Sequence, residues 1–127
     1  LAFLAASEIN TMEAFKLFLK DYPNAIDFKS AEKKYHLLEY QKLTREGDAY
    51  SYQMFIENRT GNPYVGDAEE EVYKIYTLDG KPESYEKFIE SIAVYNRFFN
   101  AAQHNIYFIC FFYSILFVCC CCFIYFY

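Results

Sequence analysis

The chain has 127 residues, of which 54% are hydrophobic, 22% aromatic and 23% charged, and its formal net charge at pH 7 is −5. This length allows one small domain or two helical units and excludes a large enzyme. Charges of both signs are interspersed and form no basic stripe that could follow a phosphate backbone, so nucleic acid is excluded as a partner.

Charge and cysteine are unevenly distributed along the chain. The 12 basic and 17 acidic residues all precede Phe98, whereas all five cysteines lie in residues 106–127. Residues 1–105 therefore have no thiol for nucleophilic catalysis, for a disulfide or for a zinc site that would include His36 and His104. From this distribution we expect no metal site, no cofactor and no enzymatic activity.

The N-terminal segment is apolar. Residues 1–7, Leu-Ala-Phe-Leu-Ala-Ala-Ser, predict the remnant of a signal peptide, because the apolar run closes on small residues at Ala5 and Ser7. This interpretation implies the secretory route, with an extracellular or lysosomal location. The alternative is an apolar turn of helix.

Two amphipathic helices are predicted next. Apolar side chains recur at three- and four-residue steps in residues 9–22, and Asn10 or Thr11 can cap this helix. Ser30 can cap a second helix, whose end is marked by Gly47. The apolar face of the second helix is formed by Ala31, Tyr35 and Leu38.

A short strand is predicted after the second helix. Residues 50–57 alternate with period two, which is typical of a β-strand with one buried face. The residues that would share one face are Tyr50, Tyr52, Met54 and Ile56. The turn-rich stretch that follows begins with Asn58-Arg59-Thr60, an N-glycosylation sequon if the chain enters the secretory route.

Two more helices are predicted before the end of the charged part. One covers residues 69–76, and Ser84 caps a longer one with Phe88, Ile92 and Tyr95 on its apolar face. The predicted fold is therefore mainly α, with short helical hairpins and one short β-strand, followed by a C-terminal hydrophobic helix.

The C-terminal segment, residues 106–127, carries no charge, no Gly and no Pro. As a helix it would reach about 33 Å, which is enough to cross the core of a bilayer, so it is a candidate transmembrane segment. The alternative is a non-coding region that was read in frame, since Phe, Ile, Tyr, Cys and Leu have T-rich codons.

An internal similarity appears when the chain is aligned with itself so that Glu13 falls on Glu71. Glu13-Ala-Phe-Lys-Leu-Phe18 then lies over Glu71-Val-Tyr-Lys-Ile-Tyr76, with like chemistry at nearly every position. This alignment predicts a duplicated helical unit.

Several motifs follow one another in a characteristic order. Phe15 and Phe18 lie on an aromatic first helix, and the second helix carries residues spaced four apart, namely Glu32, His36 and Tyr40. Arg45-Glu46-Gly47 and then Ser51-Tyr52-Gln53-Met54 come next. In this order the motifs resemble the cathepsin propeptide inhibitor domain, the pro-region of papain-like cysteine proteases, which also occurs as free-standing inhibitors.

The resemblance implies a function. It implies an inhibitor of a papain-like cysteine protease, or a propeptide fragment, that occludes the protease cleft. The residues that would contact the protease are Tyr50, Tyr52, Met54 and Ile56. Residues 58–65 would run through the active-site groove. The alternative is a small single-pass membrane protein with an acidic helical interaction module.

The domain organisation follows from these features. We predict a signal-peptide remnant in residues 1–7, a first propeptide-like unit in 8–62, a linker in 63–68, a second, degenerate propeptide-like hairpin in 69–105, and a hydrophobic tail in 106–127.

Overall fold

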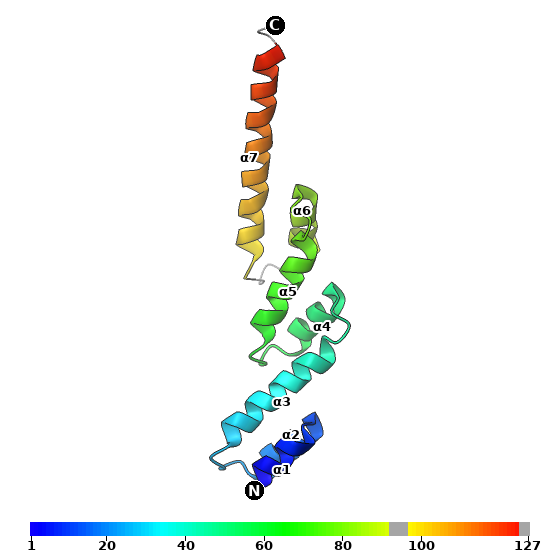
Figure 1. Ribbon diagram of the computed structural model, residues 1–127, viewed down its shortest axis with the longest axis vertical. Helices are drawn as coiled ribbons and strands as arrows, with labels where there is room; N and C mark the ends of the chain where they lie inside the picture. Colours follow the sequence, from blue (N-terminus) through cyan, green and yellow to red (C-terminus); the bar gives the residue numbers. More distant parts are fainter. Residues whose placement is uncertain (92–96, 125–127) are drawn as a thin grey trace. The chain divides into compact units, whose positions relative to one another are not determined.

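A computed structural model describes the backbone of residues 1–91 and 97–124, and the side chains of residues 1–91 and 97–112 (Figure 1). Seven helices and no strand are found in these residues. They are α1 (Ala2–Ile9), α2 (Met12–Asp21), α3 (Phe28–Leu43), α4 (Ala49–Asn58), α5 (Val65–Thr77), α6 (Pro82–Ser91) and α7 (Phe99–Ile124). The chain forms two compact units, Leu1–Ala68 and Glu69–Tyr127.

The prediction of a mainly α fold is confirmed, but the predicted strand is wrong. Its residues form α4, whose first turn is closed by Asp48. The Asp48 carboxylate accepts a hydrogen bond from the Ser51 amide at 2.8 Å, and the Ser51 hydroxyl donates to the Asp48 carbonyl at 2.9 Å. These hydrogen bonds lower the pKa of Asp48. The alternating pattern failed because Phe55, assigned to the polar face, is the buried residue of this segment.

The predicted limits of the earlier helices are partly confirmed. Thr11 caps α2, since its hydroxyl accepts a hydrogen bond from the Ala14 amide at 3.3 Å. The cap predicted for α3 is wrong, because Asp27 precedes the helix and Ser30 lies within its first turn. The predicted linker, residues 63–68, includes the start of α5.

The later helices differ more from the prediction. Ser84 lies inside α6, which begins at Pro82, and a turn at residues 97–98 precedes α7. Ile92 and Tyr95 lie outside the described residues. Residues 106–124 of the predicted C-terminal helix belong to α7, which begins earlier, at Phe99, and residues 125–127 lie outside the described part.

The predicted transmembrane character of this helix is not supported. In the part of the chain that the structure describes, no helix combines the length and the apolar composition that crossing a membrane requires. The side chains of residues 113–127 lie outside the described part.

The core of the first unit forms where α1, α2 and α3 meet. Phe15, Phe18 and Ala31 are buried there, and the Phe3 ring lies 6.4 Å from Phe15 and 5.7 Å from Phe18. Ala6 of α1 is also buried. The residues predicted as a signal-peptide remnant therefore pack against α2, as expected for the alternative, an apolar turn of helix.

Three helical hairpins in the described residues each contain an aromatic contact of the same kind. In each, a ring on the first helix meets, edge to face, a phenylalanine on the second helix, and the separation of the two residues along the chain is always the same. The contacts are Phe3–Phe18 at 5.7 Å and 62°, Tyr40–Phe55 at 5.2 Å and 75°, and Tyr73–Phe88 at 5.3 Å and 82°. We call this contact the aromatic joint.

The turn between the two helices is also repeated. At the same place between its two rings, each hairpin has a residue with positive φ, namely Asn10 at 50°, Gly47 at 68° and Gly80 at 65°. Glycine and asparagine adopt this left-handed conformation at the lowest cost, and it ends the first helix. In the second and third hairpins the glycine amide donates to a threonine carbonyl at 3.0 Å.

The sequence contains the corresponding repeat. The segments Phe3–Lys20, Tyr40–Glu57 and Tyr73–Glu90 each place an aromatic residue first, Ser or Thr at the fifth position, Asn or Gly at the eighth, and Phe or Tyr at the thirteenth. The alignment of Glu13 with Glu71 instead pairs α2, the second helix of a hairpin, with α5, the first helix of another. The repeated unit is therefore the hairpin, and it occurs three times.

A third ring stacks on the first in two of the hairpins. Tyr64 lies 5.5 Å from Tyr40 at an interplanar angle of 21°, and Phe98 lies 5.0 Å from Tyr73 at 16°. The segment that follows each of these hairpins is thereby attached to its joint.

We expect Phe55→Ala and Phe88→Ala each to destabilise the unit that contains it by about 3–5 kcal/mol, because each removes a fully buried ring and leaves a cavity. Urea denaturation followed by circular dichroism measures this free energy. Met54→Ala is the control, because Met54 is exposed on α4, and it should change stability by less than about 1 kcal/mol. Equal effects of Phe55→Ala and Met54→Ala would contradict the aromatic joint.

Candidate functional site

The residues predicted to contact a protease do not share a face. On an α-helix successive residues are rotated by about 100°, so Tyr50 and Met54 lie on one side of α4 while Tyr52 and Ile56 lie on the other. Tyr50 and Met54 are exposed, whereas Tyr52 packs 6.4 Å from Tyr40. The four residues therefore form two pairs on opposite sides of α4, Tyr50 with Met54 and Tyr52 with Ile56.

The residues of the resembling motif have mixed environments. Phe15 and Phe18 are core residues, and Tyr40 is the first ring of the second aromatic joint. Glu32 is exposed. His36 is partly buried, and its Nδ1 atom lies 3.8 Å from a Glu39 oxygen and has no hydrogen-bond partner within the described residues.

A buried carboxylate fastens the loop between α4 and α5 to α3. Glu39 is only 8% exposed. Its Oε1 atom accepts a hydrogen bond from Arg59 Nε at 2.8 Å, and its Oε2 atom accepts one from Asn62 Nδ2 at 3.0 Å. The side-chain Oδ1 atom of Asn62 in turn accepts a hydrogen bond from the Tyr64 amide at 2.9 Å. We call this cluster the Glu39 latch.

The glycosylation candidate lies beside this latch. Asn58 is the last residue of α4 and is exposed, and its side-chain amide donates to the Met54 carbonyl at 2.8 Å. Its sequon shares Arg59 with the latch. Modification of Asn58 stays a prediction.

The second unit has a different polar cluster. The Tyr73 hydroxyl accepts a hydrogen bond from Asn105 Nδ2 at 2.9 Å, which ties α5 to α7. Glu69 lies 3.6 Å from Arg97. Burial raises the pKa of Glu69, and the positive charge of Arg97 acts in the opposite direction. These contacts surround an aromatic joint, and their position indicates a structural role.

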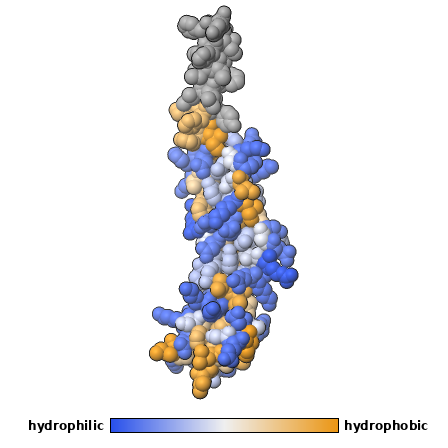
Figure 2. Space-filling model, in the orientation of Figure 1, coloured by the Kyte–Doolittle hydropathy of each residue, from blue (hydrophilic) through white to orange (hydrophobic). Residues whose placement is uncertain are grey.

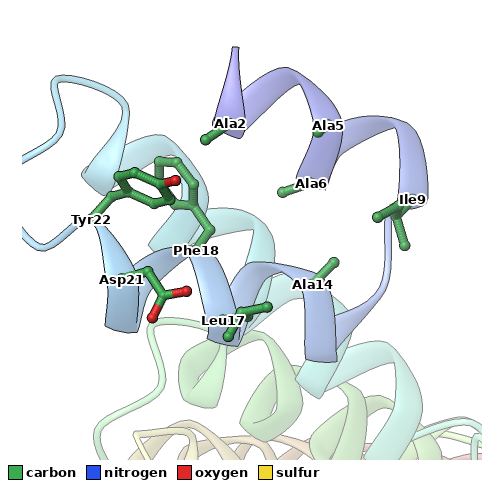
Figure 3. Close-up of a pocket in the computed structure, with 9 residues that line it drawn as sticks. All are labelled: Ala2, Ala5, Ala6, Ile9, Ala14, Leu17, Phe18, Asp21 and Tyr22. Atoms are coloured by element: carbon green, nitrogen blue, oxygen red, sulfur yellow. The ribbon is translucent and has the colours of Figure 1, made fainter.

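A groove of about 260 Å³ lies between α1 and α2 (Figure 3). Its lining is apolar except for one carboxylate. The lining residues are Ala2, Ala5, Ala6 and Ile9 of α1, with Ala14, Leu17, Phe18 and Asp21 of α2 and the adjacent Tyr22. Apolar side chains gather on the surface over these two helices (Figure 2).

The large apolar side chains of the groove are open to solvent. Ile9 is 63% exposed, Leu17 58% and Tyr22 49%. Leu4, on the same helix as Ile9, is also exposed. Contiguous exposed apolar surface of this kind is uncommon on a soluble domain and marks a contact site.

The hairpin repeat does not require this apolar surface. When the repeated segments are aligned, the second hairpin has Lys42 in place of Ala5, Glu46 in place of Ile9, Met54 in place of Leu17 and Arg59 in place of Tyr22. The same aromatic joint thus forms beneath a largely charged surface. The apolar lining of the groove is therefore not repeated in the second hairpin.

Titratable groups do not assemble into a reactive centre here. Among the described residues, no three His, Cys, Asp or Glu side chains lie close enough to hold a metal ion. The two polar clusters have their carboxylates engaged by arginine.

The sequence reasoning missed the latch and the groove. Glu39 was not among the predicted site residues. The local signal for this cluster is Asn62, two residues before Tyr64, because asparagine side chains in turns commonly accept hydrogen bonds from the backbone. The sequence of α1 by itself does not predict a groove. Comparison of the three repeated segments would have identified the first as unusually apolar.

The comparisons with known proteins add no relative. No protein-family model, no curated protein and no solved structure matches this chain. Its function is therefore argued from the geometry alone.

We expect Glu39→Ala to destabilise the first unit by about 1–3 kcal/mol, because Arg59 and Asn62 lose their acceptor. Thermal unfolding of the full chain measures the loss. Glu32→Ala on the same helix is the control and should have little effect, because Glu32 is exposed. Identical unfolding of the two variants would mean that the latch does not contribute to stability.

Proposed function

We propose that this chain is a non-catalytic binding module, in which tandem helical hairpins present an apolar groove to a helical segment of a protein partner. The exposed groove between α1 and α2 is the observation that carries the proposal. Helical repeat proteins characteristically bind partners through side chains that vary between repeats while the packing contacts stay the same.

The chemistry of the groove defines the kind of partner. Two helices already accommodate a third in this unit, since α3 packs on α2 with Ala31 fully buried. An amphipathic helix could lie on α1 and α2 in a similar way, with large apolar side chains above the four alanines. Such anchors contribute most of the binding energy in helix-in-groove contacts.

Inhibition of a papain-like cysteine protease is the second candidate. The observation that favours it is the Glu39 latch, because a loop that enters a protease cleft must be held in place to resist cleavage. Residues 59–64 are the part of the chain that the latch holds. The helix at residues 49–58 counts against it, since an inhibitor of this kind needs an extended segment.

Secretion and membrane attachment stay predictions from the two ends of the chain. Phe3 and Ala6 have packing roles in α1, which a segment destined for cleavage does not need. Carbonate extraction of the native protein distinguishes an anchored chain, which remains with the membranes, from one that is released.

The binding proposal is tested with a displayed library of amphipathic helical peptides selected on the full chain. We expect selected peptides to bind at least about tenfold more weakly to Leu17→Asp, because a charge would then be desolvated in the groove. Leu78→Asp is the matched control, since Leu78 is exposed in the turn after α5. Peptides that bind Leu17→Asp as tightly as the original chain would contradict the groove.

The inhibitor candidate is tested with a panel of papain-like proteases and one serine protease. It predicts sub-micromolar inhibition of the cysteine enzymes alone, weakened at least about tenfold by Glu39→Ala because the loop loses its attachment. Glu32→Ala should inhibit like the original chain. Absence of inhibition by the folded chain would remove this candidate and leave the groove proposal unaffected.

A further inference from the structure

Helix α7 presents an uncharged aromatic face. Its side toward α6 includes Ala102, which is fully buried, whereas Phe108 is 55% exposed, Phe111 62% and Phe112 48%. The spacing of these three phenylalanines places them on one face, and the rings of Phe108 and Phe112 lie 4.6 Å apart. About half of each side chain is open to solvent among the described residues.

This face and the groove of the first hairpin are complementary in size and length. The groove is lined by four alanines, which leave room for large side chains, and the face supplies three rings. From His104 to Phe112 the helix rises about 12 Å, and the eight residues of α1 rise about the same distance. The largely apolar face and the largely apolar groove are therefore similar in length.

One polar group on each surface can also form a hydrogen bond across the contact. Asp21 is the one charged residue of the lining, and it lies at the end of the groove away from Ile9 (Figure 3). His104 is exposed on α7, one turn before Phe108, and its imidazole can donate a hydrogen bond to a carboxylate. With His104 beside Asp21, the three rings lie along the groove toward Ile9.

We propose that the α1/α2 groove of one chain binds the aromatic face of α7 in a second copy of the chain. The inference rests on the proposed binding function and names the partner of that same groove. Because groove and face are different surfaces, the contact is heterologous and joins chains head to tail. A head-to-tail dimer still has one free groove and one free aromatic face, so assembly can proceed beyond a dimer.

Sedimentation of two full-length variants, alone and mixed, tests this arrangement. Leu17→Asp removes the groove and Phe108→Asp removes the face, so each variant alone should sediment as a monomer while the original chain forms larger species. An equimolar mixture should give a one-to-one dimer, because one intact groove and one intact face remain. Leu78→Asp should associate like the original chain.

The charge pair provides an independent test. Asp21→Lys should weaken association at least about tenfold, and the double variant Asp21→Lys with His104→Glu should recover most of the loss. The proposal would be overturned if the original chain were monomeric, or if oligomers persisted in both Leu17→Asp and Phe108→Asp.

Other outcomes separate the inference from the proposed function. A mixture that stays monomeric would contradict the head-to-tail contact. If library peptides still bind the groove while the chain is monomeric, the groove serves another protein and only the self-association fails. Association that depends on Phe108 but not on Leu17 would show that the aromatic face contacts another surface of the second copy, which would overturn the pairing with the groove.

Discussion

The fold of this protein depends on a contact between two aromatic rings. In each hairpin the first helix contributes one ring and the second contributes a phenylalanine that meets it edge to face at 5.2 to 5.7 Å. Short helices have few residues with which to bury apolar surface, and aromatic side chains bury the most surface per residue. A single such pair can therefore fix two short helices against each other.

The joint also determines the turn between the helices. For the phenylalanine to return to the first ring, the chain must reverse within a few residues, and a residue with positive φ allows this at Asn10, Gly47 and Gly80. The threonines of the second and third hairpins support the reversal, since their hydroxyls donate to Tyr40 and Tyr73 carbonyls at 2.8 and 2.7 Å. Ring, turn and ring thus form one structural unit that the chain uses three times.

Around this repeated unit the surfaces have diverged. The second hairpin carries a buried carboxylate at Glu39, which fastens the following loop, whereas the matching residue in the first hairpin is Ala2, part of the apolar groove. Surface residues outside the joint can vary because they do not take part in its packing. Binding properties can therefore differ between hairpins whose backbones are alike.

The sequence by itself determined the helical class, the helix α2 with its Thr11 cap, the end of α3 before Gly47 and the core positions Phe15 and Phe18, because these follow from local spacing and capping. It did not determine that residues 49–58 are helical, since four of the five large apolar side chains, Tyr50, Tyr52, Met54 and Ile56, occupy alternate positions as in a strand, and Phe55 alone breaks the alternation. Only the tertiary structure decided this, because Phe55 is buried against Tyr40, on which Tyr64 stacks. The Glu39 latch and the α1/α2 groove likewise arise from residues that are distant in sequence or on different helices, and no local pattern specifies which of them meet.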